Sequence, residues 1–168
     1  MKNLMSLARR CWSMAGKVAV MAAVGAVAVT VAPSPASAST PGQFLTHWQL
    51  ENYQTHLCLD GDGGRIWTTG DCPSFNTYFA VYTTPWDGFY NLQDPQTGLC
   101  LDGGGRVLET PCNWNNEYQA WYPGGQGPAA TVGNKATGRC LDSNFNNEAY
   151  TNPCDWNNVY QNWFIRQA

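Results

Sequence analysis

The sequence predicts an all-β domain that is built three times from one unit of about forty residues. Residues 112–122 read CNWNNEYQAWY and residues 154–164 read CDWNNVYQNWF. A weaker third copy at residues 72–82 reads CPSFNTYFAVY, and the three copies align without gaps from their cysteines. Ahead of each copy stands a shared Cys-Leu-Asp, which begins at Cys58, Cys100 and Cys140. A repeat of this period decides the architecture before any local pattern does.

Residues 1–38 predict a secretory signal peptide. Four basic residues precede an uncharged apolar run at residues 18–31. Ala36-Ser37-Ala38 then supplies the small residues of a cleavage site. The apolar run is shorter than the ~18 residues that a membrane span needs. We therefore expect a secreted protein whose mature chain, residues 39–168, forms a single domain.

The charge of the mature chain excludes two classes of partner. Removal of residues 1–38 leaves five basic residues against twelve acidic ones, a net charge of −7. An acidic surface repels phosphate backbones and anionic lipid, so we expect neither nucleic acid nor a membrane as a partner. We expect the domain to be a monomer.

Each repeat contains the same succession of elements. The repeats span about residues 44–83, 86–123 and 128–166. Apolar residues lead into the Cys-Leu-Asp cysteine through a predicted strand, a turn and a second strand. Gly98 and Gly138 stand two positions before that cysteine and predict a positive φ in the turn, so His56 must adopt the same conformation in the first repeat.

The number of repeats selects the architecture. A propeller needs about four or more blades to close, and this chain has three units. Short strands separated by Gly, Asn and Asp turns, without a helical period outside the signal peptide, favour four strands per repeat around a pseudo-threefold axis. That arrangement is a β-trefoil.

The cysteines favour one disulfide per repeat. Loss of Cys11 with the signal peptide leaves six cysteines, an even number that is typical of a disulfide set in an oxidising compartment. Six cysteines allow fifteen pairings. Threefold symmetry favours the pairing in which each repeat closes its own loop of 12 or 14 residues. The predicted bridges are Cys58–Cys72, Cys100–Cys112 and Cys140–Cys154.

The order Cys-Leu-Asp, second cysteine, Gln-x-Trp resembles the ricin B-chain-type lectin family. Gln119-Ala120-Trp121 and Gln161-Asn162-Trp163 carry the Gln-x-Trp signature, whereas the first repeat has Phe79-Ala80-Val81. The resemblance spans residues 48–164. It implies a β-trefoil that binds sugars in up to three shallow pockets, one in each repeat, and a core position for Trp121 and Trp163.

The chain departs from the family pattern at two positions of each pocket. The aromatic platform that the family usually has two residues before the second cysteine is replaced by Gly70, Thr110 and Asn152. The Asn that often precedes the Gln is replaced by Tyr78, Tyr118 and Tyr160. Each pocket is therefore altered, and the first, which also has Phe79 in place of the Gln, is predicted to bind sugar most weakly.

A sugar receptor needs a carboxylate to accept from hydroxyl groups, an amide, and an aromatic surface for the apolar face of the ring. One Asp per repeat and the nearby amides supply the polar groups. Trp114 and Trp156 lie in polar loops and are candidate platforms, Tyr150 is a candidate in the third repeat, and Trp67 is either a platform or a core residue of the first. The candidate carbohydrate-binding residues are Asp60, Asp102, Asp142, Asn116, Asn158, Gln119, Gln161, Trp114, Trp156 and Tyr150.

The Gln of the signature has two open roles, a structural hydrogen bond or a ligand contact. We expect residues 118–122 to form a strand, whose alternation places Gln119 and Trp121 on one side, and Tyr118, Ala120 and Tyr122 on the other.

Other chemistry has little support in the sequence. Residues 60–64 read DGDGG but lack the twelve-residue spacing and closing Glu of a calcium loop, so we predict no metal site and no cofactor. One Asp per repeat in the same role indicates binding rather than acid–base catalysis, and we expect no enzymatic activity.

The leading hypothesis is a secreted module that binds a glycan or polysaccharide. The alternative is a protein-binding trefoil, such as a secreted inhibitor or a partner of another exported protein.

Overall fold

The computed structural model describes residues 40–72, 77–125 and 127–167, which form twelve β-strands and little helix. The signal peptide predicted for residues 1–38 lies outside the described residues. Within those ranges, no helix has the length and apolar character of a membrane-spanning segment. The strands are β1 (Phe44–Asn52), β2 (Cys58–Gly61), β3 (Ile66–Thr69), β4 (Tyr78–Thr83), β5 (Tyr90–Gln93), β6 (Leu99–Asp102), β7 (Leu108–Pro111), β8 (Trp121–Gly124), β9 (Ala130–Asn134), β10 (Arg139–Ser143), β11 (Ala149–Pro153) and β12 (Asn162–Gln167).

Six of the strands close into a barrel. Antiparallel pairs run from β12 to β1, β4, β5, β8 and β9, and β9 pairs again with β12. Each repeat contributes its first and fourth strands to this circuit. Because the circuit is complete, the barrel leaves no edge strand unpaired.

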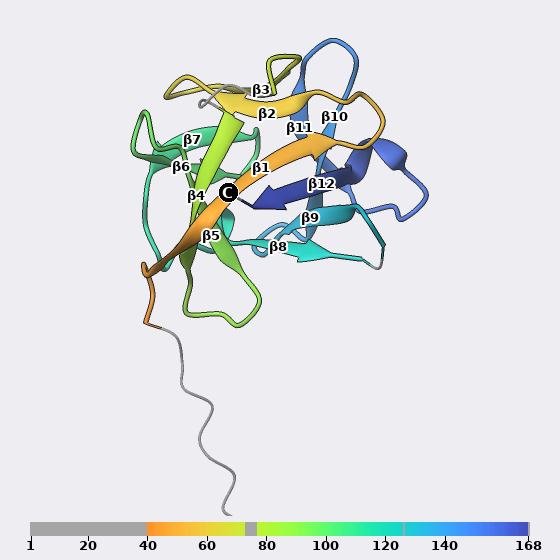
Figure 1. Ribbon diagram of the computed structural model, residues 1–168. Coiled ribbons are helices and arrows are strands. Elements are labelled where there is room, and N and C mark those ends of the chain that lie inside the picture. The colour runs from red at the N-terminus through yellow and green to blue at the C-terminus, as the bar shows by residue number, and fades with distance from the viewer. Residues whose placement is uncertain (1–39, 73–76, 126, 168) are drawn as a thin grey trace, which may run out of the picture. The chain divides into compact units, whose positions relative to one another are not determined.

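The other six strands form three hairpins, β2–β3, β6–β7 and β10–β11. Each hairpin joins the barrel through the cysteine of its Cys-Leu-Asp, which pairs with the first strand of the same repeat. Figure 1 shows the three hairpins, in yellow, green and blue, spread around the barrel strands. This topology confirms the predicted β-trefoil.

The core repeats three times as well. Trp121 and Trp163 are fully buried, and Val81 fills the equivalent position in the first repeat. The indole Nε1 of Trp121 donates to the carbonyl of Leu101 at 2.8 Å, and Trp163 donates to Leu141 at 3.1 Å. Both rings are therefore core residues, as predicted, with their polar atom satisfied inside the core. The equivalent aliphatic residues that surround them are Leu50, Leu92, Val132, Leu59, Leu101 and Leu141.

The turn before each hairpin confirms the prediction for His56. Its φ is 56°, beside 71° for Gly98 and 63° for Gly138. In all three turns the backbone N–H of this residue donates to the carbonyl four positions earlier. A left-handed His is unusual, and the repeat geometry imposes it here.

The three disulfides are those that the repeat predicts. Cys58–Cys72, Cys100–Cys112 and Cys140–Cys154 have Cα–Cα distances of 5.2, 4.9 and 4.9 Å. Each ties the start of a hairpin to the loop that follows it. A closed loop of this size stabilises the fold by about 3 kcal/mol in the chain-entropy model.

The strand expected at residues 118–122 is wrong in its first half. Glu117–Gln119 and the equivalent Val159–Gln161 are one-turn 3-10 helices, and the strand begins only at Trp121. The side chain of Asn116 accepts from the backbone N–H of Tyr118 and turns the chain before the strand. Ala120 is consequently buried instead of facing outward with Tyr118.

Candidate functional site

The aspartate of the second repeat is partly exposed and held by three neighbours. Asp102 ends β6. Its Oδ1 accepts from the backbone N–H of Gly104 at 2.9 Å, and its Oδ2 accepts from Asn116 Nδ2 at 3.2 Å and Thr110 Oγ1 at 3.3 Å. These contacts fix the carboxylate at the rim of the hairpin while part of it stays open to solvent.

An exposed ring stands beside this carboxylate. A Cβ atom built on Gly104 would lie 3.1 Å from Asp102 Oδ1 and 3.3 Å from Tyr118 Cδ1, so the ring and the carboxylate flank the same glycine. Tyr118 is 47% exposed. The second repeat therefore presents an acceptor, an amide and an aromatic surface together, with no side chain at Gly104 between them.

The third repeat holds its aspartate with an even denser set of amides. Asp142 Oδ2 accepts from Asn152 at 3.1 Å, Asn158 at 2.9 Å and Gln161 at 3.2 Å. Here the carboxylate is only 2% exposed, and its Oδ1 has no hydrogen-bond partner among the described residues. Tyr150 lies opposite Asp142 in the hairpin register.

Three rings belong to this part of the third repeat, and one of them, Tyr150, lies beside the covered aspartate. Burial, together with the negative charge of Asp142, raises the pKa of the Tyr150 hydroxyl, which therefore stays protonated. The rings of Phe145 and Tyr160 meet edge to face with centroids 6.0 Å apart, and Phe145 is 63% exposed. The third repeat is thus rich in aromatic surface but closed over its carboxylate.

In the first repeat, the counterpart of Asn116 and Asn158 is Asn76, which lies outside the described residues. Asp60 Oδ1 accepts from the backbone N–H of Gly61 at 2.8 Å, and no side-chain amide of a described residue reaches it. Burial raises the pKa of the Asp60 carboxyl; the Gly61 N–H opposes this shift, and the charge of Asp94 adds to it. Trp67 lies opposite Asp60 in the hairpin and is half-buried.

The signature glutamine is missing from the first repeat. Phe79 stands in its place and is buried in the core. A glutamine from the barrel, Gln49, instead donates to the carbonyl of Cys72 and to Thr77 Oγ1. Cys72 and Thr77 are thus held by a glutamine of β1, whereas the other two repeats use a glutamine at the end of a 3-10 turn.

Gln119 and Gln161 are buried, and the fold uses their amides. Gln119 Oε1 accepts from the backbone N–H of Asn113 at 2.8 Å, and Nε2 donates to the carbonyl of Pro111 at 2.9 Å. Gln161 makes the equivalent pair of bonds and adds the one to Asp142. Of the two roles left open by the sequence, this geometry favours the structural one.

The two loop tryptophans do not share one environment. Trp114 is half-buried, with its ring 5.0 Å from that of Tyr82 and its Nε1 only 2.8 Å from a Cβ built on Gly42. Trp156 is 64% exposed and borders a cavity of about 400 Å³ beside Tyr53. No contact described for either ring involves the aspartate of its own repeat.

One group of potential metal ligands occurs among the described residues, and the stretch at residues 60–64 is a second candidate from the sequence. Glu51, Cys58 and Cys72 have ligand atoms close together, but the two sulfurs are joined in a disulfide. In the stretch that resembles a calcium loop, Asp62 pairs with Arg65 at 2.8 Å. Neither group offers a free set of oxygen ligands of the kind that calcium requires.

The sequence indicated the aspartates and the asparagines of the candidate sites, but it missed Tyr118, Tyr160 and Phe145. The usable signal was the Tyr that precedes the Gln in the second and third repeats. Nothing in the repeated sequence pattern points to Phe145 as a site residue.

Comparison with known proteins identifies the scaffold. A family model for the ricin-type beta-trefoil lectin domain matches residues 46–163. The designed threefold-symmetric protein ThreeFoil superposes with a TM-score of 0.63 at 16% identity, over 71% of this chain and 96% of that one. SeviL bound to asialo-GM1 saccharide gives a TM-score of 0.62 at 13% identity, over 77% of this chain and 99% of that one.

A third structure is a longer protein. The lectin of Polyporus squamosus, bound to a human-type influenza-binding epitope, gives a TM-score of 0.65 at 14% identity over 74% of this chain. The match spans 50% of that lectin. At these identities the structures show a shared fold. No curated protein sequence is similar enough to this chain to count as a relative.

Proposed function

The chain belongs to the ricin-type β-trefoil lectin family, and from that premise we propose that it is a secreted carbohydrate-binding module. The family and the lectins that share its fold support glycan binding. The observation that carries the proposal for this chain is the second-repeat site, where Asp102 and Tyr118 flank a bare glycine.

The chemistry of that site matches a pyranose. An exposed phenol ring stacks against the C–H face of a sugar, and a carboxylate accepts hydrogen bonds from adjacent hydroxyl groups. Asn116, already bound to Asp102, holds the carboxylate in position. Shallow sites of this kind bind with about millimolar affinity, near −4 kcal/mol, so the loss of one contact removes a large part of the binding.

The three repeats are proposed to differ in strength. The second repeat is the principal site because its carboxylate is open. The third has the same amide framework and more aromatic surface, but a sugar reaches Asp142 only after Tyr150 moves. The first is the weakest because Asp60 is buried and Phe79 stands in place of the signature Gln.

A glycan array with the purified protein identifies a neutral ligand, and titration of two variants then tests the site. We expect Tyr118→Ala to weaken binding about tenfold or more, whereas Tyr122→Ala, another exposed Tyr of the same segment, leaves it unchanged. Asp60→Ala should have little effect. Equal losses for Tyr118→Ala and Tyr122→Ala would overturn the assignment of the site.

The alternative function is binding of another exported protein. The observation that favours it is that two of the three aspartates, Asp60 and Asp142, are buried. An array that shows no binding to any glycan, together with capture of one defined protein partner, would replace the lectin proposal with this one.

The proposal of secretion rests on the disulfides. Three bridges in one small domain form and persist in an oxidising compartment. N-terminal sequencing of the exported protein should begin at Ser39. Recovery of an intact N-terminus on the exported protein would contradict cleavage after Ala38.

A further inference from the structure

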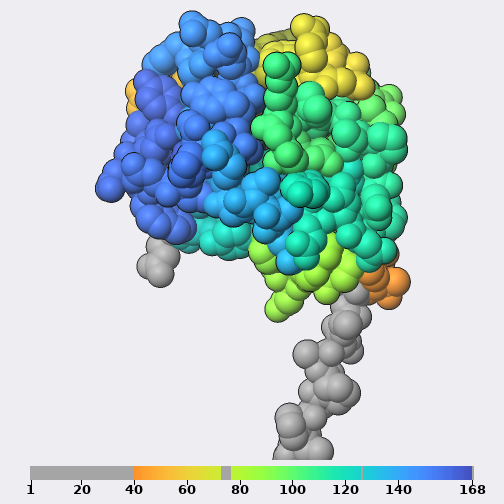
Figure 2. Space-filling model, turned by 180° about the vertical axis from the view of Figure 1, so that it is seen from behind, coloured from red at the N-terminus to blue at the C-terminus, as the bar shows by residue number. Residues whose placement is uncertain are grey.

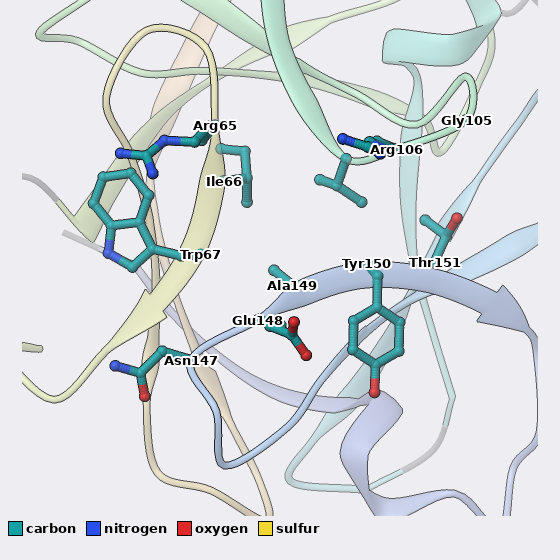
Figure 3. Close-up of a pocket in the computed structure, with 11 residues that line it drawn as sticks. Arg65, Ile66, Trp67, Gly105, Arg106, Asn147, Glu148, Ala149, Tyr150 and Thr151 are labelled. Atoms are coloured by element: carbon teal, nitrogen blue, oxygen red, sulfur yellow. The ribbon is translucent and has the colours of Figure 1, made fainter.

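A cavity of about 820 Å³ lies where the three hairpins meet. It is bordered by Arg65–Trp67 of the first hairpin, Gly105–Val107 of the second and Asn147–Thr151 of the third (Figure 3). None of the three aspartates of the repeat motif lines it. It is therefore a different site from the pockets within the repeats, although Tyr150 borders both this cavity and the third pocket.

Unequal side chains leave this space open. The hairpin registers make Ile66, Val107 and Ala149 equivalent, and all three border the cavity. Ile66 and Val107 are buried and form an apolar floor, whereas Ala149 has only a methyl group to offer. Three large side chains of equal size would fill the meeting point more completely, because protein interiors are normally close-packed.

The hairpins are also joined unequally. Isolated bridges connect the first hairpin to the second, Arg65 to Leu108, and to the third, Trp67 to Glu148. Among the described residues, no such bridge connects the second hairpin to the third. Figure 2 shows a furrow on this side, between the green surface of the second repeat and the blue surface of the third. A ligand therefore has an entrance to the cavity.

The walls carry positive charge in an acidic protein. Only five Lys and Arg residues follow residue 38, and two of them, Arg65 and Arg106, border this cavity. Arg65 is held in place by Asp62 and lies 5.8 Å from the ring of Trp67. Arg106 is exposed, and no described residue pairs with it. The one acidic wall residue, Glu148, is already bound by Asn144 Nδ2 at 2.6 Å.

We propose that the cavity between the hairpins is a fourth carbohydrate subsite that binds a carboxylated pyranose, such as a uronic acid unit. This inference rests on the proposed function and adds the ligand class of a separate site. The guanidinium of Arg106 binds the carboxylate in a bidentate manner, and Trp67 or Tyr150 contacts the apolar face of the sugar. The apolar floor at Ile66 and Val107 excludes water beneath the ligand.

Isothermal titration calorimetry of the purified protein with a short oligogalacturonide and with its methyl ester tests this site. The two ligands differ in the carboxylate charge and in one methyl group on each ester. We expect the acid to bind at least about tenfold more tightly than the ester, because a hydrogen bond to a charged group contributes more than a neutral one. Equal affinities for the acid and the ester would overturn the proposal.

Three variants place the binding in the cavity. Arg106→Gln should reduce the affinity for the acid about tenfold or more, and Arg166→Gln, which makes the same change in charge at the exposed partner of Glu51, should not. Ala149→Leu fills the cavity without changing any charge and should also abolish binding of the acid. Melting curves establish that each variant folds. Equal losses for Arg106→Gln and Arg166→Gln, or full binding by Ala149→Leu, would overturn the proposal.

The outcome for neutral sugars is separate. Failure of the oligogalacturonide to bind, while array-selected neutral glycans still bind, would overturn the fourth subsite and leave the lectin proposal standing. Failure of both ligand classes would overturn both. Preference for a sulfated oligosaccharide over the carboxylated one would overturn the assignment of the ligand as a carboxylate.

Discussion

The second and third repeats hold an aspartate in the same way but expose it differently. In both repeats an Asn that caps a 3-10 turn donates its amide to the Asp, at 3.2 Å from Asn116 and 2.9 Å from Asn158. Yet Asp102 is partly exposed, whereas Asp142 is buried. The motif therefore fixes where the carboxylate sits without fixing whether a ligand can reach it.

The hairpins account for the difference. Asp102 faces Leu108 across its hairpin, and Asp142 faces Tyr150. The second hairpin continues through Gly103, Gly104 and Gly105, which place no side chain over the carboxylate, whereas the third carries Phe145 at the same loop. Access to the site is thus determined by residues that the repeat signature does not include.

The comparison between the second and third repeats assumes that their cores are equally stable. Substitution of the core tryptophans tests this assumption and has the largest expected effect on stability. Trp121 and Trp163 are both fully buried and both donate to a carbonyl. We expect Trp121→Ala and Trp163→Ala each to lower the free energy of unfolding by about 3–5 kcal/mol. Val81→Ala should cost less, about 1.5–3 kcal/mol. Urea denaturation measures all three, and a normal stability for either Trp variant would show that the scaffolds differ.

A second test uses an acidic pair that only the second repeat has. Glu109 and Asp94 occupy the places of Thr151 and Asn134 in the third repeat. Glu109 is buried, its Oε2 accepts from the backbone N–H of Gly63 at 2.5 Å, and its protonated side chain also hydrogen-bonds with that of Asp94. Burial raises the pKa of Glu109 to about 7; the Gly63 N–H opposes the shift, and the charges of Asp94 and Asp62 add to it.

The direction of the pH dependence of stability follows from the proton that Glu109 binds in the folded state. Between pH ~4.5 and ~7 the folded protein keeps a proton on Glu109 that the unfolded chain releases, so stability falls as pH rises through this window, by about 3 kcal/mol, and then levels off. In Glu109→Gln this fall should be largely absent. Urea denaturation at about pH 5 and about pH 8 measures it. Equal slopes with pH for the two proteins would show that Glu109 is not the responsible group.

Opening the third site sharpens the comparison directly. Tyr150→Leu gives the third hairpin the residue that the second hairpin has at the same register. We expect calorimetry to show a rise from about one glycan site to about two, and stronger retention on a polysaccharide through avidity. Leu108→Tyr is the reciprocal variant and should close the second site. If neither change alters the number of sites, access is not governed by this position.

The smallest expected effect separates the two loop tryptophans. Trp114 packs on Tyr82 and Gly42, so Trp114→Ala should lower stability by about 1–2 kcal/mol, whereas the exposed Trp156 should contribute less than about 0.5 kcal/mol. Thermal melts measure both. The interpretation that both rings contact glycan stays a prediction, which affinity electrophoresis of the same variants tests. A larger loss of stability for Trp156→Ala than for Trp114→Ala would show that the Trp156 ring is packed against the domain and not exposed.

The sequence predicted the features that the repeat itself carries. Three-fold spacing was sufficient for the disulfides, for the trefoil, and for the left-handed conformation of His56, because each follows from superposing one unit on another. The aspartates and the capping asparagines were found for the same reason.

Contacts between segments without a shared period were not predictable. The approach of Tyr118 to Asp102 depends on a 3-10 turn that replaces an expected strand, and on the absence of a side chain at Gly104. In the first repeat, Gln49 of β1 takes the place of the signature glutamine and bonds to Cys72 and Thr77, more than twenty residues away in the chain. Neither leaves a pattern in the order of residues.

The central claim is that glycan enters through the open carboxylate of the second repeat. An NMR titration of isotope-labelled protein with an array-selected glycan tests it without any substitution. We predict that the backbone amide of Gly104, which donates to Asp102, and the side-chain amide of Asn116 shift at sugar concentrations that leave Asn158 unchanged. Shifts that appear first at Asn158 and Phe145, or only at the residues around Trp156, would contradict the claim.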